Sequence, residues 1–394
     1  MQQRYKLLVA VLFLSVSLQG QSTLDQILAS VQANNKTLLT EQHRNEASKA
    51  FFQTGLALYD PEISLDWLRG FPSQAGNQTD LTVAQSFDFP TAYKYRRQVA
   101  GLKTSQTAYE SELVQKEILL EARLIALHLV YLNKRKAELS KRLASAERFY
   151  SNYQKKLEQQ DATILDVNKA KLLLANVQTD LQLLEIEGDE NLRKLTELNG
   201  GNPVVFTDTI YPPIPALPDF ETLERTIEEG DPALKYLQTQ LQIGLAETNL
   251  NKALLLPKFE AGYRYQGILG QQFHGVHTGI IVPLWENKRK LNYSAMQGRE
   301  YDARIEEHRT EHYHEIKRLY EQYQSLVMLN DRYRNNLQLA SSSPLLDRAL
   351  ELGQITVLEY FLETTLYYES MDRFLELEET QQHVGALLLK FITR

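Results

Sequence analysis

A short segment of the sequence has the residue types and the spacing of a zinc site. His308, Glu311 and His312 fit H-x-x-E-H, the pattern of inverted zinc peptidases. Two histidines four residues apart share one face of a helix, which suits zinc, and the glutamate can act as a general base. Three interpretations are open: a zinc-peptidase site, incidental metal binding that includes His314, or a solvated helix face.

We favour the solvated face, and we predict no metal ligand and no catalytic residue. The match lies within a long charged helix, and the segment that begins at Gln115, its counterpart in an internal repeat described below, has no histidine. The chain has no cysteine, so thiol catalysis and thiolate ligands are excluded. Neither a phosphate-binding G-x-x-x-x-G-K-[ST] nor a nucleophilic G-x-S-x-G pattern occurs. The sequence therefore predicts a protein that is not an enzyme and that has no cofactor.

The composition excludes several further classes of protein. The chain has 394 residues, of which 43% are hydrophobic and 24% charged. It lacks the repeated apolar runs of about 20 residues that a polytopic helical membrane protein needs, and it is too apolar for a disordered chain. Nucleic acid requires a basic surface, whereas the formal net charge here is −7. We therefore expect no nucleic-acid partner.

Residues 1–20 have the pattern of an export signal. Arg4 and Lys6 precede an apolar run from Leu7 to Val16, and small residues follow near a plausible cleavage point at Gly20. The run is too short to span a bilayer. We predict that residues 1–20 are a signal peptide and that the protein is exported.

Two stretches, residues 92–199 and 286–392, are predicted to form long helical hairpins. Proline breaks helix interiors, and no proline interrupts the first stretch. Apolar residues recur in both at alternating spacings of three and four, which is typical of coiled coils. The apolar seam of the second stretch includes the polar residues Asn330 and Gln381.

Four segments alternate apolar and polar residues with a period of two, which indicates strands with one apolar and one polar face. Polar or glycine-rich linkers over Arg69–Asp80 and Gln266–Gly275 suit hairpin loops. The four predicted strands cover residues of about 57–68, 79–89, 257–266 and 275–284.

The chain is predicted to be a duplication. Repeat 1 covers residues 21–200 and repeat 2 covers residues 219–394, with a proline-rich linker over 201–218. Each repeat reads helix, strand, strand, very long helix, turn, long helix. Landmarks match in order at offsets of 193 to 199 residues: Thr23-Leu24 with Thr222-Leu223, Pro61 with Pro257, Pro90 with Pro283, and 163–166 with 356–359.

Four amphipathic strands cannot close a barrel alone, because small barrels need about eight. Three copies of the chain supply roughly 12, with the apolar face toward lipid and the polar face toward water. Aromatic residues within or beside the strands fit a girdle at the membrane interface; the alternative is the core of an ordinary sandwich. The predicted interface aromatics are Trp67, Trp285, Phe87, Phe89 and Tyr93.

With this order of elements and two turn segments, Gln159–Leu181 and Leu352–Phe374, the sequence resembles the TolC-type outer-membrane efflux proteins, or outer membrane factors. The resemblance implies a mainly α fold with β. It also implies a homotrimer with a 12-stranded β-barrel in the outer membrane, contacting lipid, and an α-helical tunnel in the periplasm.

The resemblance further implies a passive channel component of a tripartite efflux or export system. A periplasmic adaptor (membrane fusion) protein would contact the turns, and an inner-membrane pump, such as a resistance-nodulation-division transporter, would supply the energy. The expected adaptor contacts are Gln160, Asp161, Gly353 and Gln354.

The chain departs from this family in two ways. Many relatives carry a lipid-bearing cysteine at the mature N-terminus, whereas this chain has no cysteine. Some relatives close the tunnel with two acidic residues three positions apart, where this chain has Thr356 and Glu359. We expect a pore constriction at Thr356, Glu359 and Glu363, with an acidic ring that favours cations. The alternative is that both glutamates lie on a solvated helix edge.

A periplasmic coiled-coil adaptor or structural protein is the non-enzymatic alternative. It would explain the long helices and the export signal, but it would not explain four amphipathic strands flanked by aromatic residues. The strands therefore discriminate between the two interpretations.

Overall fold

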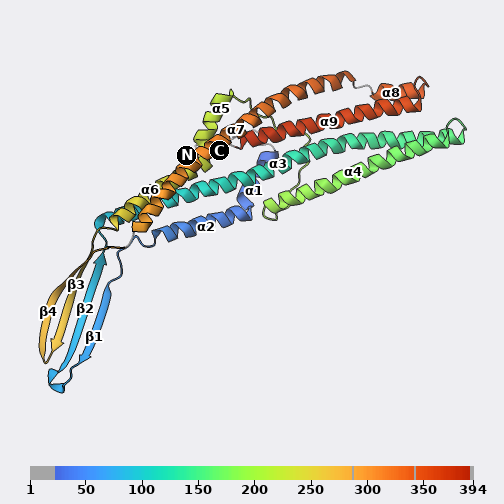
Figure 1. Ribbon diagram of the computed structural model, residues 1–394. Coiled ribbons are helices and arrows are strands. Elements are labelled where there is room, and N and C mark those ends of the chain that lie inside the picture. The colour runs from blue at the N-terminus through green and yellow to red at the C-terminus, as the bar shows by residue number, and fades with distance from the viewer. Residues whose placement is uncertain (1–22, 286–287, 341–342, 391–394) are drawn as a thin grey trace, which may run out of the picture. The chain divides into compact units, whose positions relative to one another are not determined.

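The computed structural model describes residues 23–285, 288–340 and 343–390 (Figure 1). The predicted signal peptide lies outside these residues. The chain forms two compact units, and each takes segments from both predicted repeats. Unit 1 takes the described residues of Met1–Thr37, Gln115–Thr226 and Ile316–Arg394, and unit 2 takes those of Leu38–Val114 and Ile227–Glu315.

Helices dominate the chain, and two pairs of strands interrupt them at corresponding places (Figure 1). This confirms the predicted mainly α fold with a four-strand contribution. Each run of elements begins with two helices rather than one. The first run is α1 (Thr23–Asn34), α2 (Lys36–Gln53), β1 (Glu62–Arg69), the short 3₁₀ helix η1 (Ser73–Ala75), β2 (Asn77–Phe87), α3 (Pro90–Glu158) and α4 (Ile164–Leu198). The second is α5 (Phe220–Gly230), α6 (Pro232–Ala253), β3 (Lys258–Ile268), β4 (Gln271–Ile281), α7 (Lys288–Ala340), α8 (Ser343–Glu351) and α9 (Val357–Leu389).

The four strands, all in unit 2, form one antiparallel sheet in the order β1-β2-β3-β4. The predicted loop over Gln266–Gly275 is wrong, because both strands extend into it and leave a turn of only Leu269 and Gly270. Both turn residues have positive φ, 51° and 81°, and such turns match the twist of the flanking strands. The hydrogen bonds between β3 and β4 are made by the backbone and do not depend on the side chains. The strands therefore continue through polar residues.

The sheet has one apolar and one polar face, as the alternation predicted. One row of paired residues across all four strands reads Ile63, Val83, Tyr263 and Val276. Other rows on the same face pair Leu65 with Leu81 and Phe87 with Phe259. Of these, Ile63 is 68% exposed and Val276 83% exposed in the single chain.

The opposite face of the sheet is polar, and two pairs of polar side chains meet across its strands. Arg264 on β3 lies 3.2 Å from the Asp80 carboxylate on β2, and His277 on β4 lies 3.3 Å from Glu260 on β3. Ser64 and Thr82 lie opposite each other on this face.

Long helices pair in unit 1, and two polar residues of the predicted seam meet there. The Asn330 side chain on α7 donates to the carbonyl of Leu377 on α9 (3.1 Å) and to the Gln381 side chain. Asn330 is almost fully buried. A polar pair at a seam position fixes the register of two packed helices.

The second long hairpin differs from prediction in one respect, because α7 and α8 are separate helices. Pro344 stands near the start of α8, where a proline is tolerated, whereas inside a continuous helix it would remove a hydrogen bond and clash. None of the helices in the described part of the chain combines the length and the hydropathy of a membrane span.

Candidate functional sites

The turns that end the two helical hairpins of unit 1 have the same backbone structure. Gln160 after α3 and Gly353 after α8 both adopt left-handed φ values, 65° and 69°. At the first turn, Asp161 N–H donates to the carbonyl of Lys156 (2.8 Å), and at the second, Gln354 N–H donates to that of Ala349 (2.9 Å). These are the bonds of a Schellman motif, which satisfies the last carbonyls of a helix.

The helices that follow these turns begin with the same capping box. Thr163 Oγ1 accepts from Asp166 N–H (3.3 Å), while the Asp166 carboxylate accepts from Thr163 N–H (3.1 Å). Thr356 and Glu359 repeat the arrangement at 3.2 Å and 2.7 Å. Each box satisfies two N–H groups that the helix start leaves without partners.

These caps lower the pKa of both carboxyl groups. Hydrogen bonds from the Thr163 hydroxyl and N–H lower the pKa of Asp166. The backbone N–H and the hydroxyl of Thr356 do the same for the pKa of Glu359. Both groups therefore stay ionised to lower pH than an ordinary carboxyl group.

The three predicted constriction residues lie at the start of α9. Thr356, Glu359 and Glu363 are all exposed in the single chain. Glu359 caps its own helix, a local role that the sequence analysis missed although Thr163 and Asp166 have the same spacing. Glu363 borders a groove of about 390 Å³ with Tyr333, Leu346 and Tyr367.

The four predicted adaptor contacts lie at the two turns. Gln160 and Asp161 follow the end of α3 after one intervening residue, and Gly353 and Gln354 follow the end of α8 in the same way. All four are exposed. Exposed leucines flank the second turn at Leu352 and Leu358, so both polar and apolar groups are available to a partner.

The predicted interface aromatics fall into two groups. Trp67 on β1 and Trp285 after β4 are 63% and 87% exposed. Phe87, Phe89 and Tyr93 are half-buried where β2 leads into α3.

Tyr93 belongs to a polar network at this junction. Its hydroxyl accepts from Asp88 N–H (3.1 Å), and the Arg96 guanidinium lies 5.3 Å from its ring centre. Arg96 also pairs with Asp88, which is 2% exposed, and donates to the Tyr59 hydroxyl. The sequence indicated the aromatic ring of Tyr93 but not the polar network around it.

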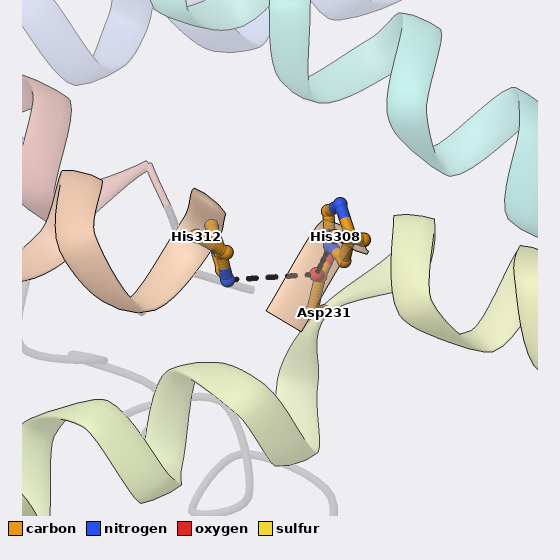
Figure 2. A group of neighbouring side chains, drawn as sticks. All are labelled: Asp231, His308 and His312. Atoms are coloured by element: carbon orange, nitrogen blue, oxygen red, sulfur yellow. Dashed lines mark hydrogen bonds and ion pairs between the residues drawn. The ribbon is translucent and has the colours of Figure 1, made fainter. Parts of the chain in front are cut away.

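The H-x-x-E-H segment lies on α7 in unit 2, where both histidines meet Asp231 (Figure 2). His308 Nε2 lies 2.5 Å from Asp231 Oδ2, and His312 Nδ1 lies 3.7 Å from the same oxygen. The two imidazole rings stack with centres 5.2 Å apart. Asp231 is 5% exposed and His312 9%.

The preferred interpretation of this segment, a solvated face, is therefore wrong for the two histidines. The helix turns His308 and His312 inward, whereas Glu311 and His314 are exposed. Asp231 was not identified from the sequence, although the Asp-Pro pair at 231–232 is a signal for a helix start.

Asp231 is held in place by the start of α6. It is the N-cap residue, and its Oδ1 accepts from Ala233 N–H (2.8 Å). Burial opposes ionisation of Asp231, but hydrogen bonds from His308 and Ala233 outweigh it and lower its pKa. The hydrogen bond with Asp231 raises the pKa of His308, against the opposing effect of burial.

Comparison with solved structures identifies channels with the same fold. The outer-membrane channel CmeC of Campylobacter jejuni superposes with a TM-score of 0.77 at 13% identity, over 94% of this chain and 85% of that one. VceC of Vibrio cholerae, an outer membrane protein, gives 0.77 at 14% identity, over 94% and 95%. CusC, a protein that forms a transmembrane channel, gives 0.81 at 13% identity, over 95% and 92%.

No family model and no curated protein matches the sequence. At this level of identity the solved structures establish the fold alone, which is shared with these outer-membrane channels and is the fold that the resemblance to the TolC type implied. The match spans nearly the whole of both chains, so it includes the helical hairpins as well as the sheet.

Proposed function

We propose that the protein is the outer-membrane channel of a tripartite efflux or export system, and that it works as a passive homotrimer. The observation that carries this proposal is the four-stranded sheet with an exposed apolar face. Apolar surface exposed to water has a free-energy cost of about 25 cal/mol per Å². A lipid bilayer removes that penalty.

Trimer formation also accounts for the edges of the sheet. β1 and β4 are its outer strands, and an exposed strand edge is open to pairing. When β1 of one copy pairs with β4 of the next, three copies close a barrel of roughly 12 strands. Strands of 8 to 11 residues suit a transmembrane barrel, which needs about 9 to 11 per strand.

The helical hairpins then form a tunnel in the periplasm. We place the contacts with a periplasmic adaptor at Gln160, Asp161, Gly353 and Gln354, because these exposed turns end both hairpins. Binding of the adaptor and an inner-membrane pump shifts the closed tunnel toward its open state. The channel catalyses no reaction, and the pump supplies the energy.

We place the constriction at Thr356, Glu359 and Glu363. Three copies of Glu359 form a ring of carboxylates that attracts cations and repels anions. Glu359→Gln tests the ring cleanly, because glutamine at this position retains a capping box while the charge is lost. In planar lipid bilayers the variant should conduct normally with a severalfold lower preference for cations. Asp166→Asn, at the corresponding cap, is the matched control. Equal cation selectivity in the wild type and both variants would contradict the proposed carboxylate ring.

Cell fractionation tests the function itself. The protein should be found in the outer membrane as a trimer whose migration in gels changes on heating. Purified trimer should form discrete conducting channels in planar bilayers. A monomer in the periplasmic fraction that forms no channels would instead support the alternative, a coiled-coil adaptor.

A further inference from the structure

Asp231, His308 and His312 bring three ligand-type atoms together from two elements of unit 2. Asp231 begins α6, and the two histidines lie one helical turn apart on α7 (Figure 2). One oxygen or nitrogen from each residue lies within 4.8 Å of the other two. In the described part of the chain, no other group of histidine and acidic residues meets this criterion.

The spacing of these atoms suits a small divalent ion. Zinc lies about 2.1 Å from nitrogen and oxygen ligands in a tetrahedron, so two ligands of one ion are about 3.4 Å apart. The distances from Asp231 Oδ2 to the two imidazole nitrogens, 2.5 Å and 3.7 Å, lie on either side of this value. To bind one ion, His308 and Asp231 have to move apart from 2.5 Å, and His312 has to approach Asp231 slightly from 3.7 Å.

The geometry of the cluster differs from that of another histidine–carboxylate group in the described part of the chain. His128 in unit 1 provides the contrast, because its Nδ1 meets Glu379 while its Nε2 lies 3.0 Å from Glu187. One imidazolium there satisfies two carboxylates on opposite sides of the ring, so the ligand atoms cannot converge on one ion. At Asp231 one carboxylate oxygen lies near a nitrogen of each of two imidazoles, so the three ligand atoms converge on one point.

We propose that Asp231, His308 and His312 form a binding site for a divalent transition-metal ion, with zinc as the best fit. Two imidazoles and one carboxylate select zinc, nickel, cobalt or copper over magnesium and calcium, which prefer oxygen ligands. Asp231 Oδ1 remains hydrogen-bonded to Ala233 N–H, which orients the carboxylate from its outer side.

The site joins the start of α6 to the middle of α7. The ion replaces the hydrogen bond between His308 and Asp231 with coordination bonds to both helices, and it leaves at least one position for water. Its role in this proposal is to stabilise unit 2. It does not depend on transport through the channel.

Zinc binding by the purified full-length trimer in detergent tests the proposal. After chelator treatment, reloading with zinc and gel filtration in metal-free buffer, elemental analysis should find one zinc ion per chain. His308→Gln and His312→Gln should each weaken zinc affinity at least tenfold. His314→Ala is the matched control, because His314 is an exposed histidine on the same helix, and it should bind zinc as the wild type does.

Spectroscopy on the unaltered protein keeps the test decisive if the variants fail to fold. Cobalt should give the visible absorption of a four- or five-coordinate ion, and X-ray absorption of the zinc form should show two imidazole ligands. Less than stoichiometric zinc, an octahedral cobalt spectrum, or equal zinc binding after loss of either histidine would overturn the proposal and leave an ordinary ion pair.

Discussion

The two repeats agree at their hairpin turns and differ at the junctions between their first two helices. Both turns have a left-handed residue followed by a capping box, 193 residues apart. At the junctions, Asn35 and Asp231 occupy corresponding positions 196 residues apart. Each accepts a hydrogen bond from the backbone N–H two residues later, at 2.9 Å and 2.8 Å.

Beyond that shared bond the junctions diverge. Asn35 donates from its side chain to the carbonyl of Leu198 (2.8 Å), which is a neutral contact. Asp231 carries a charge and faces two histidines, whereas the corresponding positions in repeat 1 are Gln115 and Leu119. The two turns have the same backbone requirements and the same structure. Each junction needs only one hydrogen-bond acceptor, and in repeat 2 that acceptor, Asp231, also faces two histidines.

The largest expected difference between the junctions is the response to zinc. Zinc at 100 times its dissociation constant should stabilise the local structure around Asp231 by about 2.7 kcal/mol. Amide exchange in the first turn of α6 should then slow about 100-fold. Amide exchange in the first turn of α2, beside Asn35, should not change. Hydrogen exchange followed by mass spectrometry measures the exchange rates of both helix starts. Equal protection of the two junctions would contradict the comparison.

Exchanging the left-handed residues should affect the two turns in opposite directions. Gln160→Gly removes the steric cost of a side chain at positive φ, so it should stabilise the first turn by about 1 kcal/mol. Gly353→Gln introduces that cost and should destabilise the second turn by a similar amount. Hydrogen exchange at Asp161 and Gln354 reports each effect. Changes of the same sign would show that the two turns are not equivalent.

Removing the cap hydroxyls should affect both turns equally. Thr163→Ala and Thr356→Ala each delete one hydrogen-bond acceptor at a helix start, at a cost of about 1 kcal/mol in local stability. Limited proteolysis at the turns, compared with wild type, checks the prediction. A substantially larger effect at Thr356 would mean that contacts between subunits also depend on that residue.

The smallest expected effect is a parallel response to acid. Hydrogen bonds lower the pKa of Asp166 and of Glu359. Their stabilisation is therefore present above the unfolded pKa, near 4, and is lost as pH falls through the lower folded values. The rates of amide hydrogen exchange at both turns, corrected for their intrinsic pH dependence, should rise together below about pH 4. Asp166→Asn and Glu359→Gln should each abolish the rise at their own turn only.

Local sequence patterns were enough to predict the turns and the faces of the sheet. The matching segments 163–166 and 356–359 predicted the two turns, although their capping-box spacing was not recognised, and the period of two placed Ile63 and Val276 on the apolar face. The seam residues Asn330 and Gln381 followed from heptad spacing. Each of these features depends on residues that are close in sequence or on a regular spacing, either the period of two in strands or the heptad spacing in helices.

The site at Asp231 could be predicted only in part. The spacing of His308 and His312 indicated a shared helix face, but the partner lies 77 residues earlier in the chain. Only the packing of α6 against α7 brings them together. Similarly, the turn at Leu269 and Gly270 depended on the backbone pairing of β3 with β4, which continues through the polar residues on both sides of the turn.

Pairing between β1 of one copy and β4 of the next tests the central claim most directly. Because the chain has no cysteine, Ser64→Cys and His277→Cys can be introduced together on the polar face of these two strands. A short thiol crosslinker applied to outer membranes should yield covalent dimers and trimers, while each single variant remains monomeric in denaturing gels. Crosslinking confined to single chains would contradict a trimeric barrel.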